Sequence, residues 1–143
     1  MACIQPLLTE RSVLRLAGER AERKQAHWLA IAQAACEQCG RARVPLIEPV
    51  RTLAAFLLLP AQGLRLLLSL DPAARALPER AAVAGPAVLT LSGPEGGLTP
   101  DEEAQARSAG YAATGLGGRV LRADTAPLAV LAWLALQSPT SPP

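Results

Sequence analysis

The sequence has little net charge, because its 14 Lys and Arg residues are nearly balanced by 12 Asp and Glu residues. A formal charge of +2 is too small by itself to indicate a nucleic-acid-binding protein. Residues 1–80 hold the basic excess, so this half is the favoured face for a polyanion. Thirteen of the fourteen cations are Arg, however, and codon usage in a GC-rich genome explains that bias better than phosphate binding does.

The sequence also lacks a long uninterrupted apolar segment. A membrane helix needs about 20 apolar residues in a row, whereas the stretch from Leu53 to Leu70 is broken by Pro60, Gly63 and Arg65. The first twelve residues, MACIQPLLTERS, lack the basic region and apolar run of a signal peptide. An odd number of cysteines, three, argues against a disulfide framework. We expect a soluble, cytoplasmic protein with no membrane partner.

A metal site is not predicted either. Cys36 and Cys39 have the C-x-x-C spacing, but there is no second pair, and the single histidine, His27, falls in the same predicted helix. A structural zinc site needs four ligands, so helix packing is the favoured role of these cysteines. Trp28 and Trp133 lie on apolar helical faces and are assigned to the core or to a dimer interface.

What the sequence does contain is typical of one folded domain, because half of its 143 residues are hydrophobic. Short apolar runs bounded by turn residues predict strands. The predicted strands are Ile4–Leu8 (buried), Val44–Ile47, Leu64–Leu70, Ala87–Ser92 and Tyr111–Leu116. Val50–Leu59 fits a short helix or a buried strand equally well. Residues 73–86 are predicted to be mainly loop, and residues 138–143 a disordered tail.

Three helices are expected between these strands. The first covers residues 19–38, with Trp28, Ile31, Ala32, Ala35 and Cys39 on its packed face and Gly40 at its end. The second begins with Thr99, Pro100 and Glu102, the pattern of a capping box, and ends near residue 109. The third follows Asp124 and Thr125 and is packed by an apolar set: Leu128, Leu131, Ala132, Leu134 and Ala135.

Alternating strands and helices indicate an α/β domain with a mostly parallel sheet and flanking helices. Ligands of such sheets bind outside the carboxyl ends of the strands. Two glycine-containing loops are predicted there, Gly93–Gly97 and residues 116–126. Together they could form one pocket, with backbone polar groups for the edge of an adenine and Val120 and Leu121 for its faces. Taken alone, the first loop would be interpreted as a plain tight turn.

The first loop does not match the known phosphate-binding patterns. It lacks the Lys-Ser/Thr ending of a P-loop and the G-x-G-x-x-G spacing of a dinucleotide site. A nucleotide triphosphate enzyme is therefore a minor alternative, and it would bind ATP.

Four segments carry a resemblance to a known family. They are IQPLLTERS (Ile4–Ser12), AACEQCGRARVP (Ala34–Pro45), LSGPEGGLTPDE and LGGRVLRADTA, in that order along the chain. Together they resemble the RsmE-type 16S ribosomal RNA uracil-N3-methyltransferases, of the SPOUT class. The similarity covers nearly all of residues 3–137.

The resemblance implies a parallel α/β fold whose C-terminal segment forms a trefoil knot, and a homodimer that completes the substrate site. It also implies that S-adenosylmethionine (SAM) is the cofactor and that the substrate is 16S rRNA in the 30S subunit. The residues that would surround or edge the cofactor are Leu70, Pro72, Gly93, Pro94, Glu95, Gly96, Gly97, Leu116, Gly117, Val120, Leu121, Thr125 and Ala126.

The sequence departs from the family pattern in two ways. Residues 1–137 match a truncated methyltransferase domain, without the N-terminal PUA-like RNA-binding domain and without the first strand and helix. The usual Thr-Glu-Thr is Ala123-Asp124-Thr125 here. The competing interpretation is an inactive paralogue or fragment that dimerises or binds RNA without turnover.

Methylation of uracil N3 requires loss of a proton and alignment of the nitrogen with the methyl donor. The predicted catalytic residues are Arg122, which would stabilise the uracil anion or contact phosphate, Asp124 or Glu10 as the base, and Arg11. Glu95 is expected to hold its turn through backbone N–H groups. The predicted RNA contacts are Arg11, Gln38, Arg41 and Arg43, with helix capping an equal alternative for Gln38.

Overall fold

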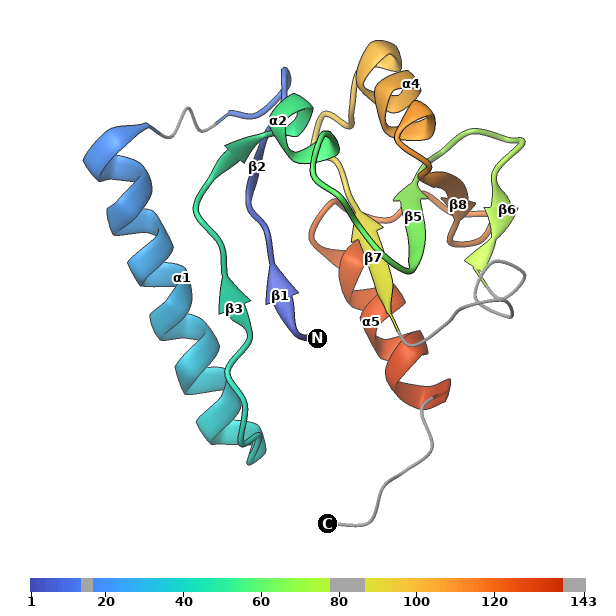
Figure 1. Cartoon of the computed structure of the whole chain (residues 1–143). Coiled ribbons are helices and arrows are strands. Elements are labelled where there is room, and N and C mark those ends of the chain that lie inside the picture. Colours follow the sequence, from blue (N-terminus) through green and yellow to red (C-terminus); the bar gives the residue numbers. More distant parts are fainter. Residues whose placement is uncertain (14–16, 78–86, 138–143) are drawn as a thin grey trace.

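The computed structural model describes residues 1–13, 17–77 and 87–137 (Figure 1). Its strands are β1 (Cys3–Ile4), β2 (Leu7–Leu8), β3 (Leu46–Ile47), β4 (Arg51–Thr52), β5 (Leu64–Leu68), β6 (Arg75–Ala76), β7 (Val88–Leu91) and β8 (Ala112–Gly115). Its helices are α1 (Gly18–Cys39), α2 (Leu53–Leu57), α4 (Pro100–Ser108) and α5 (Thr125–Gln137). Helices and parallel strands follow each other along the chain, as predicted for an α/β domain.

The largest sheet has four strands in the order β6-β8-β5-β7, and all neighbouring pairs are parallel. Strand β5 is central, with Leu66 paired to Thr90 of β7 and to Ala112 of β8. Side chains of consecutive residues in a strand point to opposite faces. Leu67 accordingly packs into a cluster with Leu53 and Leu91, and Leu66 into a second cluster with Leu77 and Val130.

The N-terminal strands form two small parallel sheets, β1 with β3 and β2 with β4. The prediction of one buried strand over Ile4–Leu8 was wrong, because β1 and β2 are separated by Gln5 and Pro6 and β1 is exposed. Proline has no N–H to donate to a ladder, and the Gln5 side chain instead donates to the carbonyl of Pro49 at 2.7 Å. The ambiguous segment at Val50–Leu59 contains both structures, β4 followed by α2.

Helix α1 ends where the sequence predicted, at Gly40, whose φ of +70° is the left-handed conformation that glycine adopts readily. Its packed face is different from the predicted one. Cys36 is the buried residue of this helix, and Ile31, Ala35 and Cys39 are exposed. Gln25 helps to explain the shift, because its side chain donates to the carbonyl of Ile47 at 2.7 Å and so turns a polar position toward β3.

Helix α5 packs through Val130, which is fully buried against Leu66 and was not predicted. Trp133 packs against the same cluster, which fits its predicted core role. The helix is apolar on nearly all sides, so hydrophobic periodicity could not select its inner face. Three residues predicted to pack are exposed instead: Leu128, Ala132 and Ala135.

Strand β6 lies within the stretch predicted as loop. Residues 78–86 of that stretch lie outside the described residues, as does the predicted tail 138–143. Among the residues with described positions, no helix has the length and hydropathy needed to cross a membrane. No group of three or more potential metal ligands occurs in the described ranges.

Burial raises the pKa of the Tyr111 hydroxyl.

Candidate active site

Three loops lie at the carboxyl edge of the four-stranded sheet: residues 69–74 after β5, 92–99 after β7 and 116–124 after β8. Because β5 lies between β7 and β8, the first loop lies between the other two. The N–H of Ser69 donates to the carbonyl of Thr114 at 3.1 Å and joins the ends of β5 and β8. This edge is where ligands bind in open parallel sheets. Its loops contain the predicted cofactor residues from Leu70 to Leu121, whereas Thr125 and Ala126 begin α5.

The glycine-rich turn after β7 packs tightly against its own backbone. A Cβ on Gly93 would lie 2.9 Å from the nitrogen of Leu98. The N–H of Gly97 donates to the carbonyl of Pro94 at 2.8 Å, and Gly97 has a φ of +69°. The glycines at these two positions are therefore required by the turn itself, whatever it binds.

Arg11 lies directly on this turn, although 85 residues separate it from Gly96. Its Nη1 donates to the carbonyl of Gly96 at 2.8 Å and to that of Leu98 at 3.4 Å. A Cβ on Gly96 would be 3.5 Å from the Cβ and Cδ of Arg11. The predicted RNA and catalytic residue Arg11 thus joins the N-terminal loop to the predicted cofactor residues.

Glu102 provides a second bond between the same two segments. Its Oε2 accepts from the N–H of Thr99 at 2.9 Å, and the Thr99 hydroxyl accepts from the Glu102 N–H, which confirms the predicted capping box. Its Oε1 accepts from the N–H of Glu10 at 2.8 Å. Glu102 is buried, and its bond to the Thr99 N–H is buried with it, whereas its bond to the Glu10 N–H is partly buried. The sequence contains no local signal for the bond to Glu10, which joins residues 92 positions apart.

The loop after β8 contributes an exposed charged group instead. Arg122 lies between two carboxylates, with its Nη2 3.9 Å from Glu95 Oε1 and its Nε 3.7 Å from Asp124 Oδ1. All three side chains are at least two-thirds exposed. Glu95 therefore faces Arg122, whereas the sequence assigned its carboxylate to backbone N–H groups. The Thr125 hydroxyl donates to Asp124 Oδ1 at 3.0 Å, and the N–H of Ala126 donates to the carbonyl of Arg122.

Two large apolar side chains at this edge are exposed. Leu70, next to the exposed Pro72 after β5, is 73% exposed, and Val120 after β8 is 75% exposed. Leu116 packs against the Leu66 cluster and anchors the start of its loop, while Leu121 is half-buried. Gly117 has a φ of +107°, and a Cβ there would meet no atom within 4 Å. The edge thus has exposed apolar side chains and, at Gly117, open space beside the backbone.

The remaining predicted RNA residues are not at this edge. Gln38 is exposed in the last turn of α1. The side chain of Arg41 donates to the carbonyl of Met1, and the carbonyl of Arg43 accepts from the Cys36 thiol at 3.6 Å. In Figure 1 the end of α1 lies at the opposite end of the molecule from the loop between β7 and α4.

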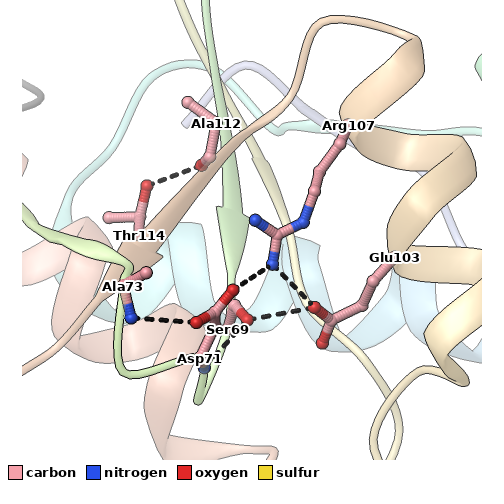
Figure 2. Close-up of polar contacts among 7 residues, drawn as sticks. All are labelled: Ser69, Asp71, Ala73, Glu103, Arg107, Ala112 and Thr114. Atoms are coloured by element: carbon pink, nitrogen blue, oxygen red, sulfur yellow. Dashed lines mark hydrogen bonds and ion pairs between the residues drawn. The ribbon is translucent and has the colours of Figure 1, made fainter.

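Sequence reasoning missed a polar cluster between the β5 loop and α4, drawn in Figure 2. It consists of Ser69, Asp71, Glu103 and Arg107, with Arg107 Nη2 2.8 Å from Asp71 Oδ2. The N–H of Ala73 and the guanidinium of Arg107 hold the pKa of Asp71 below its usual range, and the two carboxylates raise that of Arg107. Charges four residues apart on α4 were the one available signal.

Several known proteins are similar to this chain over most of its length. The RNA methyltransferase domain family matches residues 1–135. A ribosomal RNA small subunit methyltransferase E of Bacillus subtilis is 30% identical, over 93% of this chain and 55% of its own length. The crystal structure of the protein of that name from Neisseria gonorrhoeae, bound to S-adenosyl methionine, is 40% identical with a TM-score of 0.84, over 95% of this chain and 56% of that one.

A SAM-bound methyltransferase structure from Legionella pneumophila is also similar, with 34% identity and a TM-score of 0.84, over 95% of this chain and 55% of that one. The chain spans about half the length of these relatives. The match to the family nevertheless covers most of the chain. The chain therefore belongs to the RNA methyltransferase domain family.

Proposed function

We propose that this chain binds SAM at the carboxyl edge of β5, β7 and β8 and methylates N3 of a uridine in 16S ribosomal RNA. The observation that carries the proposal is the meeting of three loops at that edge, two of them containing glycines. An ion pair joins the loops after β7 and β8, and hydrogen bonds of Ser69 join the start of the β5 loop to β8 and to α4. Two similar structures contain SAM, and the names of the relatives specify small-subunit ribosomal RNA.

The residues at the edge suit an adenosine-containing cofactor. Leu70 and Val120 are exposed apolar side chains that suit the faces of a purine. A Cβ on Gly97 or Gly117 would meet no atom within 4 Å, so there is room for a ligand beside the backbone at both positions. Such a mixture of apolar surface and few polar groups is typical of cofactor sites. We assign the predicted cofactor residues to this edge, from Leu70 to Ala126.

When bound, SAM supplies an electrophilic methyl group. The residues of the chain then have two tasks, which are to orient the uracil and to remove its N3 proton. Arg122 is exposed and close to two carboxylates, where its guanidinium is available to stabilise a uracil anion. Asp124 or Glu10 would accept the proton at a carboxylate oxygen. Positioning the reactants accounts for up to about 11 kcal/mol of the barrier in such reactions.

We further propose that residues 1–137 form a SPOUT-type domain with a trefoil knot in the C-terminal segment, acting on the 30S subunit as a cytoplasmic homodimer. Exposed apolar side chains on α5, Leu128 and Leu136, are suited to burial against a second copy. Arg11, Gln38, Arg41 and Arg43 are proposed RNA contacts. Since Arg41 and Arg43 lie far from the carboxyl edge, they would bind a separate part of the RNA.

The direct test is a calorimetric titration of the chain with SAM, and with ATP as the control ligand. Binding of SAM alone is expected, and SAM at 100 times its Kd should stabilise the folded chain by about 2.7 kcal/mol. Methyl incorporation into 30S subunits, followed by mass spectrometry for 3-methyluridine, tests the reaction. If the folded chain binds neither ligand, the proposal is wrong; SAM binding without incorporation would favour a binder without turnover.

The same assay separates the two candidate bases. Asp124→Asn and Glu10→Gln each remove one carboxylate with little change of shape, and the base is the residue whose loss lowers kcat further. Glu22→Gln, on the exposed side of α1, is the matched control for loss of one negative charge. If both test variants are as active as the unmodified chain, neither carboxylate is the base.

A further inference from the structure

We infer that Arg107 and Glu103 of α4 are positioning residues that hold the β5 loop in the shape required for the cofactor. The inference rests on the proposed function, because Leu70 and Pro72 of that loop are proposed cofactor residues. Neither α4 residue was singled out by the sequence. Within the described part of the chain, their side chains bond to Ser69, to Asp71 and to each other, and these are not proposed cofactor residues. They act through Asp71, which lies between Leu70 and Pro72.

The geometry of the cluster connects α4 to the start and to the middle of the loop, at Ser69 and Asp71 (Figure 2). Arg107 Nη2 donates to Asp71 Oδ2 at 2.8 Å and to Glu103 Oε2 at 3.3 Å. The hydroxyl of Ser69, at the start of the loop, donates to Glu103 Oε2 at 3.1 Å. A single arginine thus bridges a carboxylate of the loop and a carboxylate of its own helix, and the second carboxylate holds Ser69.

The loop uses the same side chains to set its own backbone. Asp71 Oδ1 accepts from the N–H of Ala73 at 2.8 Å, and the N–H of Asp71 donates to the Ser69 hydroxyl at 3.2 Å. The carbonyl of Asp71 accepts from the N–H of Ala74 at 2.9 Å. Because the side chain of Asp71 is directed toward α4, its neighbours Leu70 and Pro72 are left exposed. The orientation of Asp71 therefore determines what the loop presents to a ligand.

The cluster is poorly suited to a purely stabilising role. The side chains of Arg107 and Asp71 are 41% and 33% exposed, and ion pairs with that much access to water contribute little to folding. We assign these ion pairs a positioning role. Helix α4 follows directly after the glycine-rich turn, and the cluster joins the β5 loop to the same helix. Loss of Arg107 would leave two carboxylates facing each other without a cation, and Asp71 would turn away.

The test compares Arg107→Ala with Gln105→Ala, which removes an exposed polar side chain from the same helix. For Arg107→Ala we expect the Kd and KM for SAM to rise about tenfold, kcat at saturating SAM to change little, and the midpoint of unfolding to stay close to that of the unmodified chain. Arg107→Lys should recover part of the affinity, because it keeps the charge. Gln105→Ala should match the unmodified chain.

A ligand-free readout separates this inference from the proposed function. Amide hydrogen exchange at Asp71, Ala73 and Ala74 should accelerate in Arg107→Ala, while the amides of α4 stay protected. Faster exchange together with weaker SAM binding supports the inference. Unchanged SAM affinity or unchanged exchange in Arg107→Ala overturns it. If the unmodified chain binds no SAM, the proposed function fails, and exchange still decides whether Arg107 holds the loop.

Discussion

The loops after β7 and β8 lie at the same edge of the sheet but are held in different ways. The glycine-rich turn after β7 is packed against its own backbone and joined to the N-terminal loop through Arg11 and the buried Glu102. The loop after β8 is connected to that turn by an exposed ion pair of 3.9 Å between Arg122 and Glu95. The turn after β7 is thus held by several contacts, whereas the loop after β8 carries exposed charged groups that a substrate can reach.

This difference indicates where stability and where chemistry reside in the site. Buried hydrogen bonds to charged groups contribute measurably to stability, whereas exposed ion pairs contribute little. Substitutions in the first loop should therefore act mainly on folding. Substitutions in the second should act mainly on turnover.

The largest effect is expected for Gly93→Ala, compared with Gly118→Ala. At Gly93 the new Cβ would lie 2.9 Å from a backbone nitrogen, so the turn must shift, at a cost of about 3 kcal/mol in the free energy of unfolding. At Gly118 a Cβ meets nothing within 4 Å, and the stability should be unchanged. Urea denaturation measures both. Equal stability of the two variants would contradict the contrast between the loops.

The next largest effect concerns Arg122→Ala, which should lower kcat for methyl transfer about 100-fold, the usual cost of losing one donor to a developing anion. Its unfolding free energy should stay within about 0.5 kcal/mol of that of the unmodified chain, since its ion pairs are exposed. SAM affinity should change less than kcat. Arg122→Lys keeps the charge and should be intermediate. Unchanged turnover in the alanine variant would remove Arg122 from the reaction.

A smaller loss is expected for Glu102→Ala, about 2 kcal/mol of stability, because two backbone N–H groups lose their buried acceptor. Glu102→Gln keeps one oxygen and should lose roughly half as much. Asp101→Asn is the control, because it removes an exposed acidic group from the same helical turn. Thermal unfolding measures all three. A loss in Asp101→Asn equal to that in Glu102→Ala would mean that helix charge, and not the bonds of Glu102, is responsible.

Features that depend on neighbouring residues could be predicted from the sequence. The end of α1 at Gly40 and the capping box of Thr99 and Glu102 were both confirmed, because each depends on hydrogen bonds within one helical turn. The α/β class with parallel strands was also confirmed. The inner face of α5 was predicted only in part, because Leu134 packs against the Leu66 cluster as expected but Val130 was missed. A helix that is apolar nearly all round carries no periodic signal for its buried side.

The site shows the same division. The two glycine-containing loops and the pairing of Arg122 with Asp124 lie within short segments, and their residues were named from the sequence. The roles of those residues in binding and catalysis stay predictions. The bonds of Arg11 to Gly96 and of Glu10 to Glu102 join residues 85 and 92 positions apart. No local pattern predicts such pairs, because they depend on how the sheets pack.

The sequence by itself determined where α1 ends and where α4 begins, and it contains the glycines of the turn after β7. Each of these follows from hydrogen bonds and steric limits within a few residues. Only the tertiary structure decided three contacts. Glu102 accepts a hydrogen bond from the Glu10 N–H, Arg11 donates to the Gly96 carbonyl, and Arg107 forms an ion pair with Asp71. Those contacts arise from the packing of α4 and the N-terminal loop around the sheet, which brings together groups that are distant along the chain.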